Sequence, residues 1–244
     1  MNRHFQDPGV QAILLDIEGT VAPVEFVYGV LFPFAREHLR SYLQDAAQAA
    51  AVRSDLQDLY QEYRAEQPQN PRLPDWSGDT LEGAIAYVEF LMDCDRKSPG
   101  LKSLQGKIWT QGYQAGTLQS QLFPDVVPAL FRWREQGKQI FIFSSGSVQA
   151  QQLIFRYAEQ GDLTAHIRGY FDTKTGPKKE ASSYRAIAAA IGNPPETLLF
   201  ISDVEAELEA AQAAGLKVLL SVRPGNEPIL NPTFRTLTSL DQVF

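Results

Sequence analysis

Four short runs of consecutive apolar residues constrain the fold of this chain most. Each run holds three or four residues bounded by polar or turn-forming residues, as expected for strands buried on both faces of a parallel sheet. Helical patterns separate the later runs and stop at Gly192 and Gly215, and glycine commonly follows the last residue of a helix. This alternation predicts a doubly wound, Rossmann-like α/β fold with strands at Ala12–Leu15, Ile140–Phe143, Leu198–Ile201 and Val218–Leu220.

The middle of the chain has a different pattern. From about Leu39 to Gln119 apolar residues recur every three or four positions, which is typical of one face of a helix. No strand-like run occurs there. We therefore predict a core of residues 1–24 and 122–244 and an inserted, all-helical cap of residues 25–121 after the first strand.

The composition narrows the classes of partner. Among 244 residues, 22 Lys and Arg stand against 29 Asp and Glu, and this net charge of −7 argues against a nucleic-acid or membrane-surface binder. Cys94 is the only cysteine, which excludes an intrachain disulfide and favours a reducing compartment. No apolar run approaches the roughly 18 residues that span a bilayer, and residues 1–9 lack the apolar stretch of a signal peptide. We expect a cytoplasmic protein that acts on a small molecule.

Three of the predicted strands run directly into polar residues of kinds found in active sites. In an open parallel sheet, ligands bind in the crevice beyond the carboxyl ends of the strands, so we expect these side chains to converge there. They are Asp16 and Glu18 after the first strand, Ser144 to Ser147 after the second, Ser202 and Asp203 after the third, and Lys178 before a helix.

Together these groups suit phosphoryl transfer. Asp16 is a possible nucleophile, because a carboxylate can form a covalent phosphoryl intermediate. Phosphoryl oxygens also need positive charge, which Lys178 and a divalent cation held by Asp16 and Asp203 would supply. Ser144 and the backbone N–H groups of the turn after it would bind phosphate oxygens. Glu18 can reach the same site as a general acid and base.

Each residue taken alone has a simpler structural interpretation. Asp16 can form a turn, Asp203 and the serines at 144–147 can cap helices, and Lys178 can lie on a solvated face. Their common placement at the ends of one predicted sheet favours the joint interpretation. Glu207, one turn after Asp203, is the best placed acidic residue to support a metal site from outside its ligand shell.

These motifs resemble the haloacid dehalogenase superfamily of aspartate-nucleophile phosphatases. The resemblance is carried by Asp-x-acid-Gly-Thr at residues 16–20, by Ser144 at a strand end, by Lys178 before a helix and by Asp203 after a later strand. Most phosphatases of that superfamily have Asp as the second acid. Here the second acid is Glu18.

The chain further resembles the enolase-phosphatases of the methionine salvage pathway. The matching segments extend from about Ile13 to Asn226, so they include the predicted cap, where related phosphatases differ most. They include Leu31 to Ala35, Leu104 to Gly106, Phe123 to Pro128, Ser144 to Val148 and Val222 to Asn226.

This resemblance implies a two-step reaction on 2,3-diketo-5-methylthiopentyl-1-phosphate. The substrate is enolised, and its phosphate is then hydrolysed to leave acireductone. The resemblance also implies one Mg²⁺ per subunit and a monomeric protein. We expect the helical insert to act as a lid, with Phe26, Tyr28 and Trp109 as candidates for reading the methylthio tail.

The resemblance implies a role for each site residue as well. Asp16 is the expected nucleophile and Glu18 the expected acid/base residue, and both are expected, with Asp203, to be metal ligands. Lys178 is expected to take part in catalysis by balancing charge on the phosphate. The residues expected to bind the phosphate end of the substrate are Ser144, Ser145 and Lys178.

Three other functions remain open at this point. The first is a plain phosphomonoesterase of the same superfamily that acts on a sugar phosphate or phosphoglycolate. The second is a non-catalytic phospholigand-binding protein, against which the joint presence of Asp16, Glu18, Lys178 and Asp203 argues. The third is a dehalogenase, which needs no Mg²⁺ and therefore no Asp203 beside Asp16.

Overall fold

The computed structural model of this chain describes residues 4–46, 50–77, 80–96 and 98–244. Residues 1–3 of the N-terminal segment considered above lie outside the described residues. The chain divides into two compact units, one of Met1–Gly29 with Gln119–Phe244 and one of Val30–Leu118. We call them the core unit and the helical unit. That the helical unit caps a catalytic core stays a prediction.

The core unit is built on a six-stranded parallel sheet of order β3-β2-β1-β4-β5-β6. This is the order of a doubly wound dinucleotide-binding-type fold, so the predicted fold class is confirmed. In the register, Leu14 of β1 lies opposite Phe141 on one side and Phe200 on the other. The strands are β1 (Ala12–Leu15), β2 (Gln139–Phe143), β3 (Gly169–Phe171), β4 (Leu198–Ser202), β5 (Lys217–Ser221) and β6 (Thr236–Leu237).

The four strands expected from the apolar runs are all present, and β3 and β6 are additional. Both additional strands lie at the edges of the sheet, and they have three and two residues. The side chains of β3 are only partly buried. A continuous apolar run signals burial on both faces, so an edge strand this short carries no such signal.

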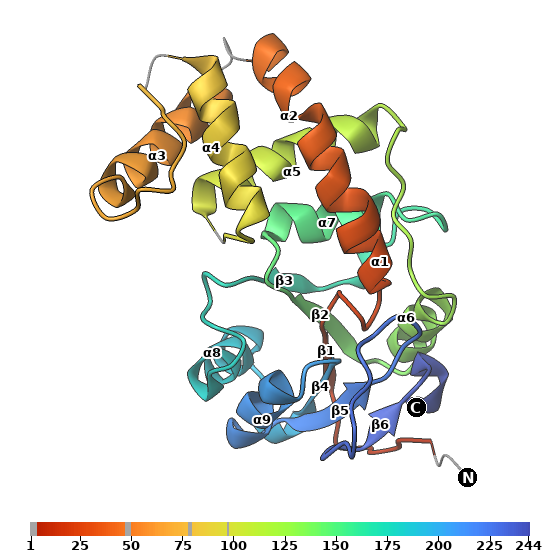
Figure 1. The fold of residues 1–244 in the computed structure, drawn as a ribbon. Helices are drawn as coiled ribbons and strands as arrows, with labels where there is room; N and C mark the ends of the chain where they lie inside the picture. The colour runs from red at the N-terminus through yellow and green to blue at the C-terminus, as the bar shows by residue number, and fades with distance from the viewer. Residues whose placement is uncertain (1–3, 47–49, 78–79, 97) are drawn as a thin grey trace. The chain divides into compact units, whose positions relative to one another are not determined.

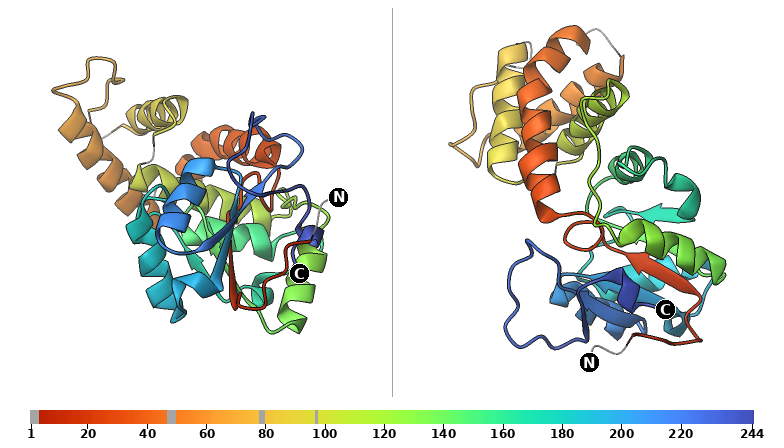
Figure 2. Two further views of the ribbon diagram at one scale, coloured as in Figure 1. Left: turned by 90° about the horizontal axis from the view of Figure 1, so that it is seen from below. Right: turned by 90° about the vertical axis from the view of Figure 1, so that its right-hand side faces the viewer.

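Helices cover both faces of the sheet in the core unit (Figures 1 and 2). The side chains of Leu14, Phe143 and Phe200 pack with α8 and α9 in one buried cluster, in which Tyr184 of α8 meets the ring of Phe143 edge-on at 5.5 Å. On the opposite face lies α6, whose Trp133 is fully buried. The helices of this unit are α1 (Val24–Phe26), α6 (Val126–Glu135), α7 (Val148–Arg156), α8 (Ala181–Ile191) and α9 (Glu205–Ala213).

Turns of other helical types connect these elements. A π-helical turn over Val27–Leu31 follows α1. Short 3₁₀ turns span Thr164–His166, Pro195–Thr197 and Leu240–Gln242. As the sequence predicts, α8 ends at a left-handed glycine, Gly192, with φ of +80°.

The helical unit contains α2 (Phe32–Ala46), α3 (Ala50–Glu66), α4 (Leu81–Asp93) and α5 (Pro99–Gln114). These elements agree with the helical periodicity expected between Leu39 and Gln119. The unit's core is rich in aromatic side chains, with Tyr63 meeting Tyr87 edge-on at 5.2 Å. Trp109 of α5 is buried in this unit and donates its indole N–H to the carbonyl of Leu31.

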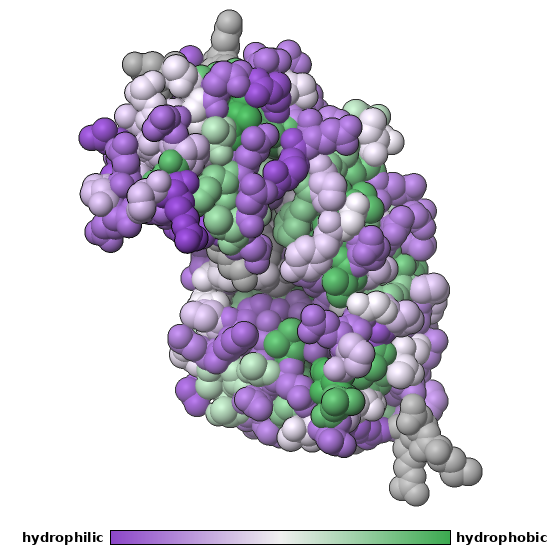
Figure 3. Space-filling model, in the orientation of Figure 1, coloured by the Kyte–Doolittle hydropathy of each residue, from purple (hydrophilic) through white to green (hydrophobic). Residues whose placement is uncertain are grey.

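Hydrophilic residues surround smaller hydrophobic areas on the face of each unit seen in Figure 3. Within the described part of the chain, no helix combines the length and apolarity needed to cross a membrane. The large hydrophobic residues that are exposed are Tyr28, Val30, Phe131, Val222 and Leu230.

The central position of β1 leads to a prediction about stability. Replacing Leu14, which is fully buried, by alanine leaves a cavity between α8 and the sheet and should lower the free energy of unfolding by about 2–5 kcal/mol. Leu230→Ala is the matched control, because that leucine is 87% exposed and should change stability by less than about 0.5 kcal/mol. Urea titration followed by circular dichroism measures both. Equal losses in the two variants would contradict the assignment of Leu14 to the core.

Candidate active site

A cavity of about 530 Å³ opens at the carboxyl ends of the core-unit strands. It lies where the crevice of an open parallel sheet is expected to bind ligands. Carboxylates dominate its wall, and Lys178 supplies a positive charge among the lining side chains. The charged and polar lining residues described below are Asp16, Glu18, Ser145, Lys178, Asp203 and Glu207.

At the base of the cavity, Lys178 bridges two carboxylates. Its Nζ lies 2.7 Å from Oδ1 of Asp16 and 2.6 Å from Oε2 of Glu207, and all three side chains are at least nine-tenths buried. The Ser202 hydroxyl, at the end of β4, lies 2.9 Å from Glu207 Oε2 and 3.2 Å from Asp16 Oδ2. The backbone N–H of Ile17 donates to Asp16 Oδ1 at 2.8 Å. Asp16 Oδ1 thus accepts from both Lys178 and Ile17, whereas the single proton of the Ser202 hydroxyl can be donated to only one of Glu207 and Asp16 at a time.

The chain segment before α8 positions Lys178. The Tyr184 hydroxyl donates to the carbonyl of Lys178 at 2.7 Å, and the Ser183 hydroxyl donates to the carbonyl of Pro177 at 2.7 Å. Burial alone would lower the pKa of the Lys178 ammonium. The charges of Asp16 and Glu207 outweigh burial and raise that pKa, so Lys178 stays positively charged.

Asp203 follows β4 and lies beside the turn after β1. A β-carbon on Gly19 would overlap the Asp203 carboxylate, and the φ of +66° is a left-handed conformation, so both packing and backbone geometry favour glycine here. Burial, and then the negative charge of Asp16, raise the pKa of Asp203 to about 7. Asp16 and Asp203 are thus two carboxylates that lie close together and are largely shielded from water.

The serine-rich loop after β2 leads into α7. Ser147 is the N-cap of α7, and its hydroxyl accepts a hydrogen bond from the N–H of Ala150. The Ser144 hydroxyl accepts from the N–H of Gly146 at 3.2 Å. Ser145 lines the cavity near the start of this helix, where backbone N–H groups and the helix dipole favour an anion.

Comparison with known proteins agrees with this geometry. A model of the haloacid dehalogenase-like hydrolase family matches residues 10–215. The chain is 53% identical over 234 residues to enolase-phosphatase E1 of Synechococcus elongatus, and the match covers 96% of this chain and 98% of that protein. The chain belongs to the enolase-phosphatase family of haloacid dehalogenase-like hydrolases.

Two more distant relatives extend the match. The enolase-phosphatase E1 of Azotobacter vinelandii is 44% identical over 235 residues, which covers 95% of this chain and 97% of that protein. The crystal structure of the UTR4 protein of Saccharomyces cerevisiae has a TM-score of 0.77 at 33% identity, covering 94% of this chain and 98% of that one. Because each match covers nearly the whole chain, the likeness to the enolase-phosphatase family includes the helical unit.

The structure brings most of the predicted enolase-phosphatase site residues together. Asp16, Glu18, Lys178, Asp203 and Ser145 all line the one cavity described above. Ser144 is not among its lining residues, and its hydroxyl accepts a hydrogen bond from Gly146 in the turn that follows. The chemical roles of all six residues stay predictions.

The three aromatic candidates for reading the substrate's tail are placed differently. Phe26 is 1% exposed, and Trp109 is buried within the helical unit. Tyr28 is 53% exposed and lines the cavity.

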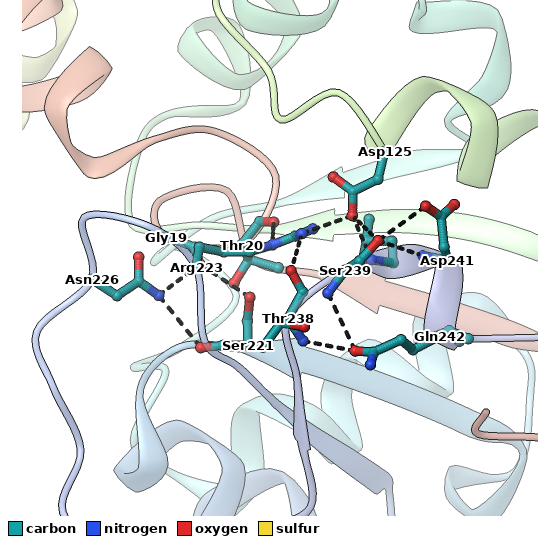
Figure 4. A network of polar contacts seen from close by, with 12 residues as sticks. Gly19, Thr20, Asp125, Ser221, Arg223, Asn226, Thr238, Ser239, Asp241 and Gln242 are labelled. Atoms are coloured by element: carbon teal, nitrogen blue, oxygen red, sulfur yellow. Dashed lines mark hydrogen bonds and ion pairs between the residues drawn. The ribbon is translucent and has the colours of Figure 1, made fainter. Parts of the chain in front are cut away.

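Sequence analysis missed two structural features of this enolase-phosphatase site. Sequence analysis placed Glu207 outside the ligand shell of a metal site, which stays a prediction, but it did not foresee the ion pair of Glu207 with Lys178. Ser221 at the end of β5, with Arg223 and Asn226 in the segment that follows, holds the turn at Gly19 (Figure 4). Two signals pointed to this segment: its place after the last predicted strand, and the resemblance of Val222 to Asn226 to the enolase-phosphatases. Neither signal gave a role to Ser221, Arg223 or Asn226, since none is a typical catalytic acid, base or nucleophile.

The raised pKa of Asp203 leads to a prediction about the metal-free enzyme. Because the folded-state pKa of about 7 exceeds the ordinary value of 3.8, ionising Asp203 destabilises the fold as the pH rises from about 4 to 7. Asp203→Asn removes that carboxylate. In EDTA it should therefore raise Tm at pH 8 and have little effect near pH 4.

Asp162→Asn is the matched control for this thermal-melting experiment. Hydrogen bonds from the hydroxyl and the N–H of Thr164 lower the pKa of Asp162, so its substitution should lower Tm at pH 8 rather than raise it. A fall in Tm for Asp203→Asn at pH 8 would contradict the strained, desolvated state assigned to Asp203.

Proposed function

We propose that this protein is a Mg²⁺-dependent, bifunctional enolase-phosphatase. It enolises 2,3-diketo-5-methylthiopentyl-1-phosphate and then hydrolyses the enol phosphate to acireductone (1,2-dihydroxy-3-keto-5-methylthiopentene) and phosphate, in L-methionine salvage from methylthioadenosine. The observation that carries the proposal is the Asp16 carboxylate, buried at the carboxyl end of β1 and paired with Lys178 in a cavity shared with Asp203. We further propose that the protein acts as a cytoplasmic monomer.

The donors in the cavity suit a single Mg²⁺. Asp16 and Asp203 are hard oxygen donors, and burial together with the negative charge of Asp16 raises the pKa of Asp203. Mg²⁺ commonly takes one or two carboxylates and completes its shell with water and substrate phosphate. Within the described residues no three acidic, His or Cys side chains form a ready-made metal-binding group, so the ligands are proposed from their common place on the cavity wall and not from a preformed cluster. We assign Asp16, Asp203 and Glu18 as its protein ligands.

Asp16 is the proposed nucleophile of the phosphatase step. One Asp16 oxygen attacks phosphorus, and the bond between phosphorus and the substrate's ester oxygen breaks. Glu18 donates a proton to that leaving oxygen and then accepts one from the water that hydrolyses the aspartyl-phosphate. Lys178, fixed at 2.7 Å from Asp16, balances the negative charge of the phosphoryl group. Bound Mg²⁺ would neutralise phosphoryl charge and stabilise the enolate formed in the first step as a Lewis acid.

Separate readings of enol formation and phosphate release test these roles. With the diketo phosphate and Mg²⁺, Asp16→Asn should lower phosphate release at least about a thousand-fold, because an amide is not a nucleophile. Glu18→Asp should lower both readings at least about ten-fold, because one methylene less shortens the reach of the acid/base group. Chelation with EDTA should abolish both readings, and added Mg²⁺ should restore them.

Matched control variants lie away from the cavity. Asp162→Asn matches Asp16→Asn, and Glu196→Asp matches Glu18→Asp. Both change exposed residues and should keep wild-type rates. Phosphate release by the wild type without any enol or acireductone signal would instead support a plain phosphomonoesterase acting on a sugar phosphate or phosphoglycolate. Wild-type rates for Glu18→Asp in both readings would remove Glu18 from the mechanism.

An apolar section of the cavity wall suits the methylthio tail. Val24, Tyr28 and Ile229 line the cavity and contrast with its carboxylates. Burying the tail against such side chains stabilises binding by about 0.8 kcal/mol per CH₂ group. We propose that Tyr28 contacts the tail.

Tyr28→Ala should therefore raise KM for the methylthio substrate about ten-fold. It should leave KM for an analogue that ends before the sulfur nearly unchanged, because that analogue does not reach the apolar wall. The control is Phe131→Ala, which removes an exposed aromatic ring on α6. Equal increases in KM for both substrates would refute a role for Tyr28 in reading the tail.

A further inference from the structure

Three side chains from the end of β5 and the segment after it donate hydrogen bonds to two carbonyl groups of the turn after β1 (Figure 4). The Ser221 hydroxyl and the Asn226 Nδ2 both donate to the Gly19 carbonyl, at 3.1 and 3.0 Å. Arg223 Nε donates to the Thr20 carbonyl at 3.2 Å. We call Ser221, Arg223 and Asn226 the carbonyl clamp. They lie about 200 residues away from the turn in sequence and act on its backbone, so they hold it whatever side chains it bears.

A buried ion pair holds Arg223, the central residue of the clamp, in place. Its Nη1 lies 2.7 Å from Asp125 Oδ2 and 3.0 Å from the Thr238 carbonyl, and its guanidinium lies 4.8 Å from the centre of the Phe123 ring. Asp125 also accepts from the Ser239 hydroxyl. Although burial opposes ionisation, the contact with Arg223 lowers the pKa of Asp125, so the pair stays charged. Asp125 and the Thr238 carbonyl therefore fix the Arg223 side chain of the clamp in position.

The turn held by the clamp has little freedom of position. Gly19 adopts a left-handed φ of +66°, and its α-carbon passes so close to Asp203 that a β-carbon would overlap Asp203 Oδ2. Asp16 and Glu18 lie immediately before this glycine. A shift of a few tenths of an ångström in the turn would change how the nucleophile and the acid/base residue face Asp203.

We propose that Asn226 and Arg223 are positioning residues, which fix the Gly19–Thr20 turn and thereby the relative placement of Asp16, Glu18 and Asp203. This inference rests on the proposed function, because it takes Asp16 as the nucleophile. It adds residues that touch neither the phosphate nor the reacting carbons. Their effect should appear in kcat more than in KM, since they act on the geometry of the reacting groups.

Asn226 gives the sharpest test because the two variants Asn226→Ala and Asn226→Asp act differently. Alanine removes one of two donors to the Gly19 carbonyl and should lower kcat about ten- to a hundred-fold while KM changes less than about three-fold. Aspartate places an acceptor against that carbonyl oxygen and should lower kcat further, although it matches asparagine in size. Asn193→Ala, in the loop that leads into the amino end of β4, is the matched control and should keep wild-type kcat.

Arg223 is tested by Arg223→Lys, which keeps the charge but cannot reach Asp125 and the Thr20 carbonyl together. Its matched control is Arg132→Lys, because Arg132 also donates to backbone carbonyls, those of Leu240 and Phe244, without touching the turn. Arg223→Lys should lower kcat about ten-fold or more, and Arg132→Lys should not.

Two readouts separate this inference from the proposed function and from a general loss of stability. Hydrogen exchange of the peptide covering Ile17–Ala22 should become faster in Asn226→Ala, Asn226→Asp and Arg223→Lys, and stay at the wild-type rate in the controls. Turnover of p-nitrophenyl phosphate, with Tm measured alongside, reports the phosphatase step without the diketo substrate. If the wild type failed on the diketo phosphate alone, the proposed function would fall while these readouts still judged the clamp.

The inference is supported if kcat falls and exchange in the turn rises while Tm stays close to that of the matched control. It is overturned if Asn226→Ala keeps kcat within about two-fold of wild type, or if exchange in the turn does not change. It is also overturned if Asn226→Asp is as active as Asn226→Ala, because a donor to the Gly19 carbonyl would then be irrelevant.

Discussion

The ammonium group of Lys178 lies between the carboxylates of Asp16 and Glu207, within 2.7 Å of each and away from water. Without this charge, two buried carboxylates would face each other unpaired, which costs several kcal/mol. The three groups come from the end of β1, the segment before α8 and the first turn of α9. Their ion pairs therefore join three separate chain segments at the carboxyl ends of the strands. The same ion pairs that hold these segments together also hold the aspartate proposed as nucleophile.

The cavity around that cluster is acidic, yet the proposed substrate is an anion. A chain with a formal net charge of −7 does not attract phosphate through its overall field. Local sources of positive potential must do so. Lys178 and the start of α7 are two that the site offers, and the proposed Mg²⁺ would be a third. Burial, and then the negative charge of Asp16, raise the pKa of Asp203 to about 7, so a second negative charge beside Asp16 is itself unfavourable.

Local patterns in the sequence predicted most of the fold. Runs of apolar residues located the four central strands, and the glycine at 192 marked the end of α8. The edge strands β3 and β6 escaped because they are too short and too exposed to need a continuous apolar run. Among the aromatic residues, sequence alone did not separate Tyr28 from Phe26, since burial depends on packing partners far along the chain.

The sequence by itself determined the fold class, the helical insert and the chemical types of Asp16, Glu18, Lys178 and Asp203, because periodicity and strand-end placement are local properties. Only the tertiary structure decided how these groups are held. It paired Lys178 with Glu207 and brought Ser221, Arg223 and Asn226 onto the Gly19 turn. Such contacts join residues that are far apart in sequence, and their partners are often backbone carbonyls, which every residue carries and no motif can distinguish.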